Sequence, residues 1–422
     1  MLKTLIIFLL IFSIIVVFHE FGHFYFARRA GILVREFSIG MGPKLFSHQA
    51  EDGVTYTIRI LPLGGYVRLA GVNEEETLVA GMEVGLSFDK NDQVSLINLS
   101  KETSVEELPV QINKVDLLDS MTIEAIPMGK EDIIRYSVSK KANVIEEDGT
   151  RLRVAPREVC YEAANVWHKM KTNIAGPVNN FILSILVFMV IGLIGPGVPS
   201  NSNQLGEIVS DSPAAKAGLH EGDIVTAIND KTISNWNELV SEIREMPGED
   251  VTVHIERNGE AKTIPLTIGK VLDEENNEEY GQIGIMVSLK TDLLSRILSG
   301  FTQTWNIVVG VVLTIASMIR TGFNINNFGG PVAMAQLTNT AVQSGTMNIL
   351  YLMGWLSANL GIVNILPMPA LDGGKVWLNI YEAIVGKPLS QEKEGIITLI
   401  GALLLIILMI AVTWNDFNRL FH

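Results

Sequence analysis

The sequence predicts a multi-pass α-helical membrane protein with four spans, a membrane-associated β-hairpin and one small α+β domain. The 422-residue chain is 48% hydrophobic and only 18% charged, whereas soluble proteins carry about 25% charged residues. Four apolar runs reach the roughly 20 residues that a helix needs to cross a bilayer. A polar stretch between the second and third runs has the turn residues and short periodic segments of a small mixed domain.

Composition also excludes some classes of function. The formal net charge is −14 and the chain has no basic stripe, so we exclude nucleic acid as a partner. Cys160 is the only cysteine, so no disulfide can form within the chain.

Positive charges orient the predicted spans. The spans are assigned to four ranges, the third including the turn that follows it: residues 1–30, 172–196, 346–374 and 395–415. Arg28 and Arg29 follow the first span, and lysines lie between the third and the fourth. Because positive residues mark cytoplasmic loops, both loops are predicted to be cytoplasmic and both termini extracytoplasmic. The first run has no small-residue cleavage site, so we predict a retained span and not a signal peptide.

A fifth apolar run covers residues 305–318. A crossing there would place the lysine-bearing loop outside, against the positive-inside rule. We therefore predict an interfacial helical region over residues 292–345. Whether residues 305–318 are interfacial or inserted stays open.

Three polar regions separate the spans. Residues 31–71 contain GVTYTIRILPLGGYVRLAG, which alternates in polarity and offers Pro62 and Gly64-Gly65 as a turn. This pattern predicts a β-hairpin. Residues 72–165 form an acidic cytoplasmic insert of unknown role. Residues 204–289 form the small α+β domain.

Residues 19 to 23 read HEFGH inside the first span. On a helix, His19 and His23 are four residues apart and share one face, with Glu20 one residue from His19. In the H-E-x-x-H pattern, two imidazoles ligate zinc and the glutamate serves a bound water as general base. The alternative is a chance match. Ionisable residues inside a span are costly and functional by default, which favours a metal site.

A catalytic zinc takes three protein ligands and keeps one open position. Asp372 is the only acidic residue between Thr321 and Tyr381. It follows the third span at the predicted cytoplasmic end, at a depth similar to that of His19 and His23. We predict Asp372 as the third ligand, with an ordinary turn aspartate as the alternative.

Together these motifs resemble the site-2 protease family, the intramembrane zinc metalloproteases. HEFGH matches the H-E-x-x-H of the family, ALDGG near the third span matches its L-D-G, and GPVNNF in the second span is similar to its N-N motif. The resemblance covers nearly the whole chain. It is strongest for bacterial members that cut anti-sigma factors and signal-peptide remnants, in the Gram-positive subgroup with a single PDZ domain.

The small domain looks like a PDZ domain. A strand from Leu205, a capped helix ending at Gly218, a strand in GDIVTAIND and an amphipathic helix from Asn235 to Arg244 follow in that order. The resemblance implies an extracytoplasmic position, where the domain either binds a trimmed substrate terminus or excludes uncut ectodomains. It also implies a membrane-reentrant hairpin, whose edge pairs with an extended substrate by strand addition.

Four asparagines lie within or at the ends of spans: Asn179, Asn180, Asn359 and Asn364. They either form interhelical hydrogen bonds or bind substrate and support an oxyanion. The resemblance to the N-N motif favours substrate binding.

The predicted function is hydrolysis of peptide bonds within the membrane by regulated intramembrane proteolysis. One Zn²⁺ per chain is held by His19, His23 and Asp372, and Glu20 acts as the general base. The predicted partners are the lipid bilayer of the bacterial cell membrane and single-span proteins already shortened by another protease. The rival hypothesis is a catalytically silent membrane adaptor that uses its PDZ domain, and the presence of Glu20 disfavours it.

Overall fold

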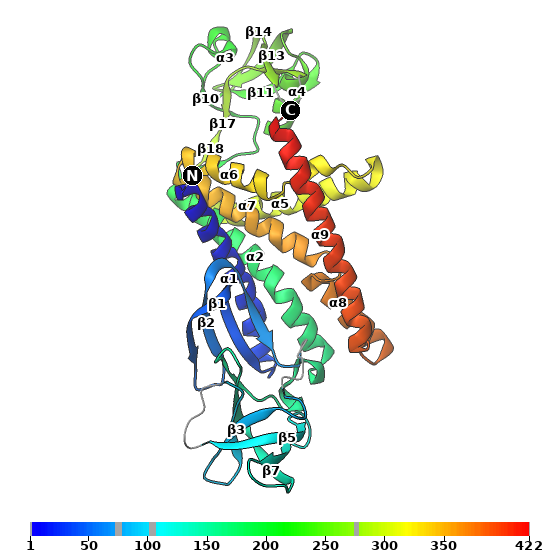
Figure 1. Cartoon of the computed structure of the whole chain (residues 1–422). Coiled ribbons are helices and arrows are strands. Elements are labelled where there is room, and N and C mark those ends of the chain that lie inside the picture. The colour runs from blue at the N-terminus through cyan, green and yellow to red at the C-terminus, as the bar shows by residue number, and fades with distance from the viewer. Residues whose placement is uncertain (1, 72–77, 101–106, 274–277, 422) are drawn as a thin grey trace. The chain divides into compact units, whose positions relative to one another are not determined.

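The computed structural model describes residues 2–71, 78–100, 107–273 and 278–421. The chain divides into two compact units. One unit joins Met1–Val187 to Gln303–His422, and the other is Phe188–Thr302. Figure 1 follows the elements along the chain, and each unit is described by itself.

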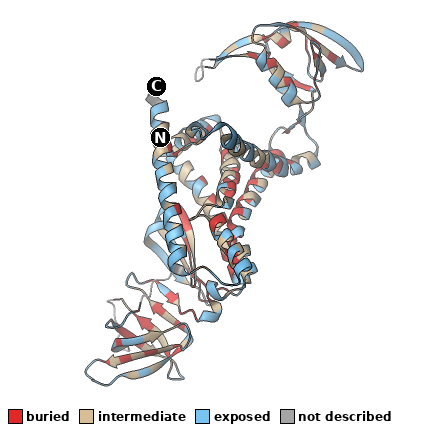
Figure 2. Cartoon of the chain, turned by 90° about the vertical axis from the view of Figure 1, so that its right-hand side faces the viewer, coloured by how far each residue is buried: buried red, intermediate tan, exposed pale blue. Residues whose placement is uncertain are grey.

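Among the described residues, five helices are long and apolar enough to cross a membrane. They are α1 (Leu2–Arg29), α2 (Val166–Ile194), α5 (Leu293–Thr321), α7 (Thr346–Ile365) and α9 (Gln391–Phe421). Many of their apolar side chains are exposed, as in Leu399 and Leu403 of α9, which are 70% and 56% exposed. Figure 2 shows exposed residues, in pale blue, along the long helices. Aliphatic faces of this length indicate a lipid environment.

The region predicted as interfacial contains one continuous helix, α5, followed by η3 (Ile325–Asn327) and α6 (Pro331–Ser344). The polar start and the apolar end of α5 form a single 29-residue helix, because no proline interrupts it. The four predicted spans are therefore four of five candidates by length and composition.

Two long strands follow α1. β1 (Val34–Gln49) and β2 (Thr55–Leu69) form an antiparallel hairpin whose turn lies at residues 50–54. The predicted turn at Pro62 and Gly64-Gly65 lies where β2 reverses direction, between residues 58 and 65. The two arms of the predicted hairpin do not pair with each other, because residues 36–39 of β1 lie between them.

β2 reverses its direction around β1, because residues 55–58 run parallel to residues 36–39 of β1 whereas residues 65–68 run antiparallel to them. Residues 36–39 of β1 lie opposite two separate parts of β2, residues 55–58 and 65–68. Gly64 has a φ of +83°, a conformation that glycine adopts at no steric cost. The two strands therefore form a small curled sheet.

The curled sheet is polar inside and apolar outside. The Thr57 hydroxyl donates to Oε1 of Glu36 at 2.6 Å, and the Arg59 guanidinium donates to the same oxygen at 2.9 Å. Glu36 is only 2% exposed. Ile58 and Ile60 alternate with these residues on the other face and are 47% and 50% exposed.

The acidic insert forms a closed sheet, which sequence reasoning did not predict. Its strands are β3 (Glu83–Phe88), β4 (Val94–Asn98), β5 (Leu108–Asp116), β6 (Thr122–Pro127), β7 (Ile134–Ile145) and β8 (Arg151–Arg153). They pair in the order β4-β3-β5-β6-β7-β8, and an additional pairing of β4 with β7 closes the sheet. Ile97, Ile112 and Ile123 fill the interior at 0–1% exposure. The turns η1 (Arg157–Val159) and η2 (Tyr161–Ala163) lead into α2.

Polar contacts join the insert to the hairpin. The Arg68 guanidinium lies 3.0 Å from the Glu146 carboxylate, and the Lys44 ammonium donates to the Thr150 hydroxyl at 2.8 Å. The β7–β8 end of the insert therefore packs on the hairpin beside α1.

The second unit contains the predicted α+β domain. Its elements are β9 (Val198–Pro199), β10 (Leu205–Ile208), α3 (Pro213–Ala217), β11 (Ile224–Ile228), β12 (Lys231–Thr232), α4 (Trp236–Glu245), β13 (Asp250–Arg257), β14 (Glu260–Thr267), β15 (Gly269–Asp273), β16 (Glu278–Gln282), β17 (Ile285–Val287) and β18 (Leu289–Lys290). The predicted order of strand, short helix, strand and amphipathic helix is confirmed. Ser212 caps α3 and Asn235 caps α4 through their side chains. β9 pairs with β18 at the base of the domain.

Candidate metal centre

Helices α1 and α2 cross at the H-E-x-x-H motif, with a glycine on each side. A Cβ on Gly22 would lie 2.4 Å from the carbonyl oxygen of Ala175, and a Cβ on Gly176 would lie 2.3 Å from Nε2 of His23. Glycine at both positions lets the two helices approach closely. His19 is consequently buried, at 7% exposure.

The structure brings the three predicted ligands together. Nε2 of His19 lies 3.2 Å from Nε2 of His23. Oδ2 of Asp372 lies 3.0 Å from the first nitrogen and 3.3 Å from the second. Within the described part of the chain, this is the one group of three His, Cys, Asp or Glu side chains whose ligand atoms converge.

This triangle of ligand atoms fits a tetrahedral zinc ion. Ligand atoms about 2.0–2.2 Å from zinc in a tetrahedron lie about 3.3–3.5 Å apart, close to the observed separations. Oδ2 of Asp372 is buried and has no hydrogen bond in the described structure beyond its approach to the two imidazoles. A buried carboxylate oxygen is costly unless a donor or a cation accompanies it. Two histidines and one carboxylate leave the fourth position open, as in catalytic zinc sites.

Polar groups on α2 contact the Nδ1 atoms of both imidazoles, on the side of each ring away from the other ligands. Nδ1 of His23 lies 2.7 Å from the carbonyl oxygen of Thr172. Nδ1 therefore carries the hydrogen, which leaves Nε2 free for a metal. Nδ1 of His19 lies 3.1 Å from the Asn180 amide, and Asn180 is fully buried. A metal on Nε2 of His19 requires that Nδ1 carries a hydrogen. Asn180 accepts this hydrogen when its amide turns Oδ1, which has no other hydrogen-bond partner, toward His19.

Glu20 is half-buried beside these ligands. It lies within electrostatic range of His19, His23, Asp372 and Lys375. Its carboxylate is not one of the three converging ligands.

The four asparagines predicted to bind substrate have different surroundings in the structure. Asn180 backs His19 and is fully buried, so the structure corrects the prediction that this side chain contacts substrate. Asn179 is half-buried and donates to the carbonyl oxygen of Phe18 at 2.8 Å. Asn359 donates to a carbonyl of its own helix, and Asn364 is half-buried. Substrate contact by these last three stays a prediction.

The segment that delivers Asp372 differs from the predicted tight turn. α7 ends before Pro367 and Pro369, but Gly373-Gly374 lie in the first turn of α8 (Asp372–Val385). A Cβ on Gly373 would lie 2.2 Å from the carbonyl oxygen of Leu366. The glycines therefore let the start of α8 fold against the end of α7, which directs Asp372 to the histidines.

Sequence reasoning missed an ion pair that joins α2 to α8. Nζ of Lys169 donates to Oε1 of Glu382 at 2.9 Å, and the two side chains are 3% and 14% exposed. The residues are 213 positions apart. In the sequence each is one charge beside an apolar run, which is too weak a signal to pair them.

A buried tyrosine strengthens the same contact. The Tyr161 hydroxyl accepts from Nδ2 of Asn173 at 2.7 Å and from Nδ2 of Asn379 at 3.3 Å. Burial raises the pKa of Tyr161 to about 12, so the hydroxyl stays protonated. These bonds hold the helix that begins with Asp372.

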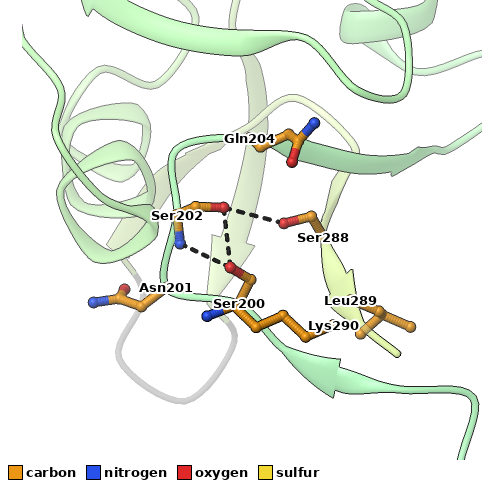
Figure 3. A pocket seen from close by; sticks show the side chains of 7 residues that line it. All are labelled: Ser200, Asn201, Ser202, Gln204, Ser288, Leu289 and Lys290. Atoms are coloured by element: carbon orange, nitrogen blue, oxygen red, sulfur yellow. Dashed lines mark hydrogen bonds between the residues drawn. The ribbon is translucent and has the colours of Figure 1, made fainter. Parts of the chain in front are cut away.

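Two cavities lie away from this centre. One, of about 570 Å³, lies in the second unit, where the hydroxyls of Ser200, Ser202 and Ser288 bond to one another (Figure 3). The other, of about 360 Å³, is lined by the end of α1 and by the insert. Neither lining includes a histidine, so neither competes with the triangle as a metal centre.

Comparisons with known proteins agree with the geometry. The family model described as peptidase family M50 matches residues 7–408. A Lactococcus lactis protein named as a zinc metalloprotease is 44% identical, with 100% of both chains covered. An Enterococcus faecalis protein named as protease eep is 43% identical, again with 100% of both chains covered.

Among solved structures, the PDZ domain of an SdrC-like protein from Listeria monocytogenes is 21% identical over 21% of this chain and 90% of that chain. The TM-score is 0.18, which is too low to carry an argument.

Proposed function

The chain belongs to peptidase family M50, and from this membership we propose that it is an intramembrane zinc metalloprotease. The proposed substrates are single-span membrane proteins already shortened by another protease, such as anti-sigma factors or signal-peptide remnants. The observation that carries the proposal is the convergence of His19, His23 and Asp372 within hydrogen-bond distance of one another, beside Glu20.

The residues divide the chemistry between them. His19, His23 and Asp372 would hold Zn²⁺, which would supply a Lewis acid for the attacking water and the scissile carbonyl. Glu20 accepts the proton of the attacking water and returns it to the leaving amine. Thr172 keeps His23 in the tautomer that binds metal, and Asn180 does the same for His19 when its amide presents Oδ1 to Nδ1.

The hairpin is proposed to extend the substrate before cleavage. A peptide bond inside a helix is shielded by its hydrogen bonds, so the substrate must first unwind. A Cβ on Gly64 of β2 would lie 3.7 Å from Val16 of α1, one turn before His19. In the described structure β1 is the only strand that pairs with residues 65–69 of β2, which leaves an edge for strand addition. The exposed Ile58 and Ile60 support contact with lipid.

The metal geometry supports the proposed four-span topology. His23 of α1 contacts the start of α2 at Thr172, so the end of α1 and the start of α2 share one membrane face. Asp372 brings the end of α7 to that face. α2 then ends, and α7 begins, on the opposite face. If α5 crossed the membrane once, α6 would have to cross back. The 14 residues of α6 extend about 21 Å, which is too short for a core about 30 Å thick.

Arg28 and Arg29 at the end of α1 place the shared face in the cytoplasm by the positive-inside rule. The termini and the PDZ domain are then extracytoplasmic, and the insert is cytoplasmic. We propose that the PDZ domain binds a trimmed substrate terminus or excludes uncut ectodomains.

The test is cleavage in lipid. Wild type and Glu20→Gln are reconstituted with a tagged single-span protein, and the products are sized by mass spectrometry. The proposal predicts a cut within the span by wild type and none by Glu20→Gln. Equal cleavage by both proteins would contradict the assignment. Substrate binding without cleavage by either would support the adaptor.

A further inference from the structure

Helix α8 buries most of its polar side chains and exposes an apolar stripe, and Lys375 is the polar residue that stays exposed. Trp377, Tyr381, Ile384 and Val385 are 56%, 42%, 80% and 44% exposed. Their spacing places them on one side of a helix. A soluble protein would show the opposite arrangement, because it buries the apolar stripe of a surface helix.

The other side of α8 is already occupied by protein. Asp372 points to the histidines, Asn379 bonds to the Tyr161 hydroxyl, and Glu382 pairs with Lys169. Asn379 is only 5% exposed. The polar groups of α8 therefore fix its rotation, and they turn the aromatic face away from the protein.

The location of α8 indicates what covers that face. Six residues separate α8 from α7 and five separate it from α9, and both neighbours are candidate spans. At about 3.5 Å per residue, connections of this length reach about 20 Å at most, so α8 cannot leave the membrane surface. Figure 1 shows α8 between these two helices.

The size and composition of α8 match an interfacial helix. Its 14 residues extend about 21 Å, too short to cross a core of about 30 Å. Trp and Tyr prefer the headgroup level of a bilayer. An amphipathic helix with such residues lies in the interface plane, where it has one wet face and one apolar face.

We propose that α8 lies in the bilayer interface, with the Trp377, Tyr381 and Ile384 face embedded at the boundary of headgroups and acyl chains. The bilayer and the Lys169–Glu382 pair then hold the helix from opposite sides. Because Asp372 is the first residue of α8, lipid contact positions the third metal ligand. This last step rests on the proposed function, whereas the location of α8 does not.

A depth measurement tests the location directly. An environment-sensitive fluorophore is attached to Ile384→Cys in a Cys160→Ala background, in lipid nanodiscs. Matched probes are placed at Leu403→Cys, an exposed position within α9, and at Met128→Cys, an exposed position in the insert. Quenching is compared for lipids that carry a spin label near the headgroup and near the chain end.

The proposal predicts stronger quenching of the Ile384 probe by the shallow label than by the deep label. The Leu403 probe should show the reverse order, and the Met128 probe should respond to neither label. An Ile384 probe that behaves like the Met128 probe would overturn the proposal by placing α8 in water. An Ile384 probe that behaves like the Leu403 probe would overturn it by placing α8 within the hydrocarbon.

A second measurement needs no cysteine changes. The chain has six tryptophans, and brominated lipid quenches those near the acyl chains. Trp377→Phe should reduce the quenched part of the emission. An unchanged quenched part would contradict lipid contact by Trp377. Neither readout uses catalysis, so an inactive protein with a shallow α8 would refute the proposed function and leave the interfacial helix intact.

The positioning step has its own readout. Trp377→Gln with Tyr381→Gln should release zinc to a chelator several-fold faster than wild type in nanodiscs. Ile319→Gln, at an 82% exposed position of α5, is the matched control and should not change the rate. Unchanged zinc release from the double variant would overturn the link between lipid contact and Asp372.

Discussion

Gly176 and His23 leave no room between them for one further carbon, since a Cβ on Gly176 would lie 2.3 Å from Nε2 of His23. The same Cβ would lie 2.7 Å from Cε1 of His19. Because Gly176 of α2 has no side chain, both imidazoles can pack against the helix at this position.

Gly176→Ala should displace the imidazoles and lower both zinc content and cleavage. A displacement of about 1 Å at a catalytic centre can cost about 100-fold in rate. Zinc per chain and cleavage rate are measured together. Gly310→Ala on α5 is the matched control, because a Cβ there meets nothing within 4 Å. Normal zinc content and activity in Gly176→Ala would contradict the packing.

Substitutions of the neighbouring residues Asn179 and Asn180 should differ in their effect on zinc affinity. Asn180→Ala removes the amide behind His19, and loss of such a partner lowers metal affinity by about 10–100-fold. Asn179→Ala should keep wild-type affinity, because Asn179 bonds to the backbone of α1 and touches no ligand. Zinc affinity is measured by competition with a chelator. Equal affinities of the two variants would refute the role given to Asn180.

The ion pair between Lys169 and Glu382 should matter more for stability than pairs at the surface. Lys169→Met leaves a buried carboxylate without its partner, which costs about 3–5 kcal/mol. The midpoint of thermal unfolding in detergent should fall, and the exchange Lys169→Glu with Glu382→Lys should restore part of it. Lys140→Met is the control, because its pair with Glu158 is 65% and 63% exposed. If Lys169→Met and Lys140→Met unfolded at the same temperature, the buried ion pair would not stabilise the fold more than the surface pair does.

The α+β domain of the second unit should lose stability in acid through Asp223. Burial raises the pKa of Asp223, but hydrogen bonds from the Arg257 guanidinium and the His220 backbone outweigh it, so the pKa lies below its usual value. A carboxyl with a lowered pKa stabilises the fold fully above its unfolded pKa of about 3.9. That stability is lost as the pH falls through the folded pKa.

Thermal unfolding of residues 198–290, which have their own core and base strands, is measured between pH 7 and pH 2. Asp223→Asn should unfold at lower temperature at pH 7 and show a flatter acid limb. Asp230→Asn, at an exposed turn, should follow wild type. An acid limb of Asp223→Asn as steep as that of wild type would contradict the assignment.

Short-range patterns predicted the core of the centre. Four-residue spacing placed His19 and His23 on one face, and the scarcity of acidic residues singled out Asp372. The order of elements in the α+β domain followed from cap and turn residues that act within a few positions. These signals are local, so the sequence carries them directly.

The remaining features depend on contacts between distant residues. The insert closes through the pairing of β4 with β7, which no local pattern encodes. Local residues predicted the reversal at Pro62 and Gly64-Gly65, but they did not show that residues 36–39 of β1 lie between its two arms. Asn180 looked like a substrate ligand until its burial behind His19 was seen.

The central claim is that His19, His23 and Asp372 hold one zinc ion that Glu20 serves. The most direct measurement is zinc per chain, by mass spectrometry of the purified proteins, for wild type, Asp372→Ala and Glu20→Gln. The account predicts about one zinc in wild type, loss in Asp372→Ala, and retention without cleavage in Glu20→Gln. Full zinc in Asp372→Ala, or cleavage by Glu20→Gln at the wild-type rate, would contradict it.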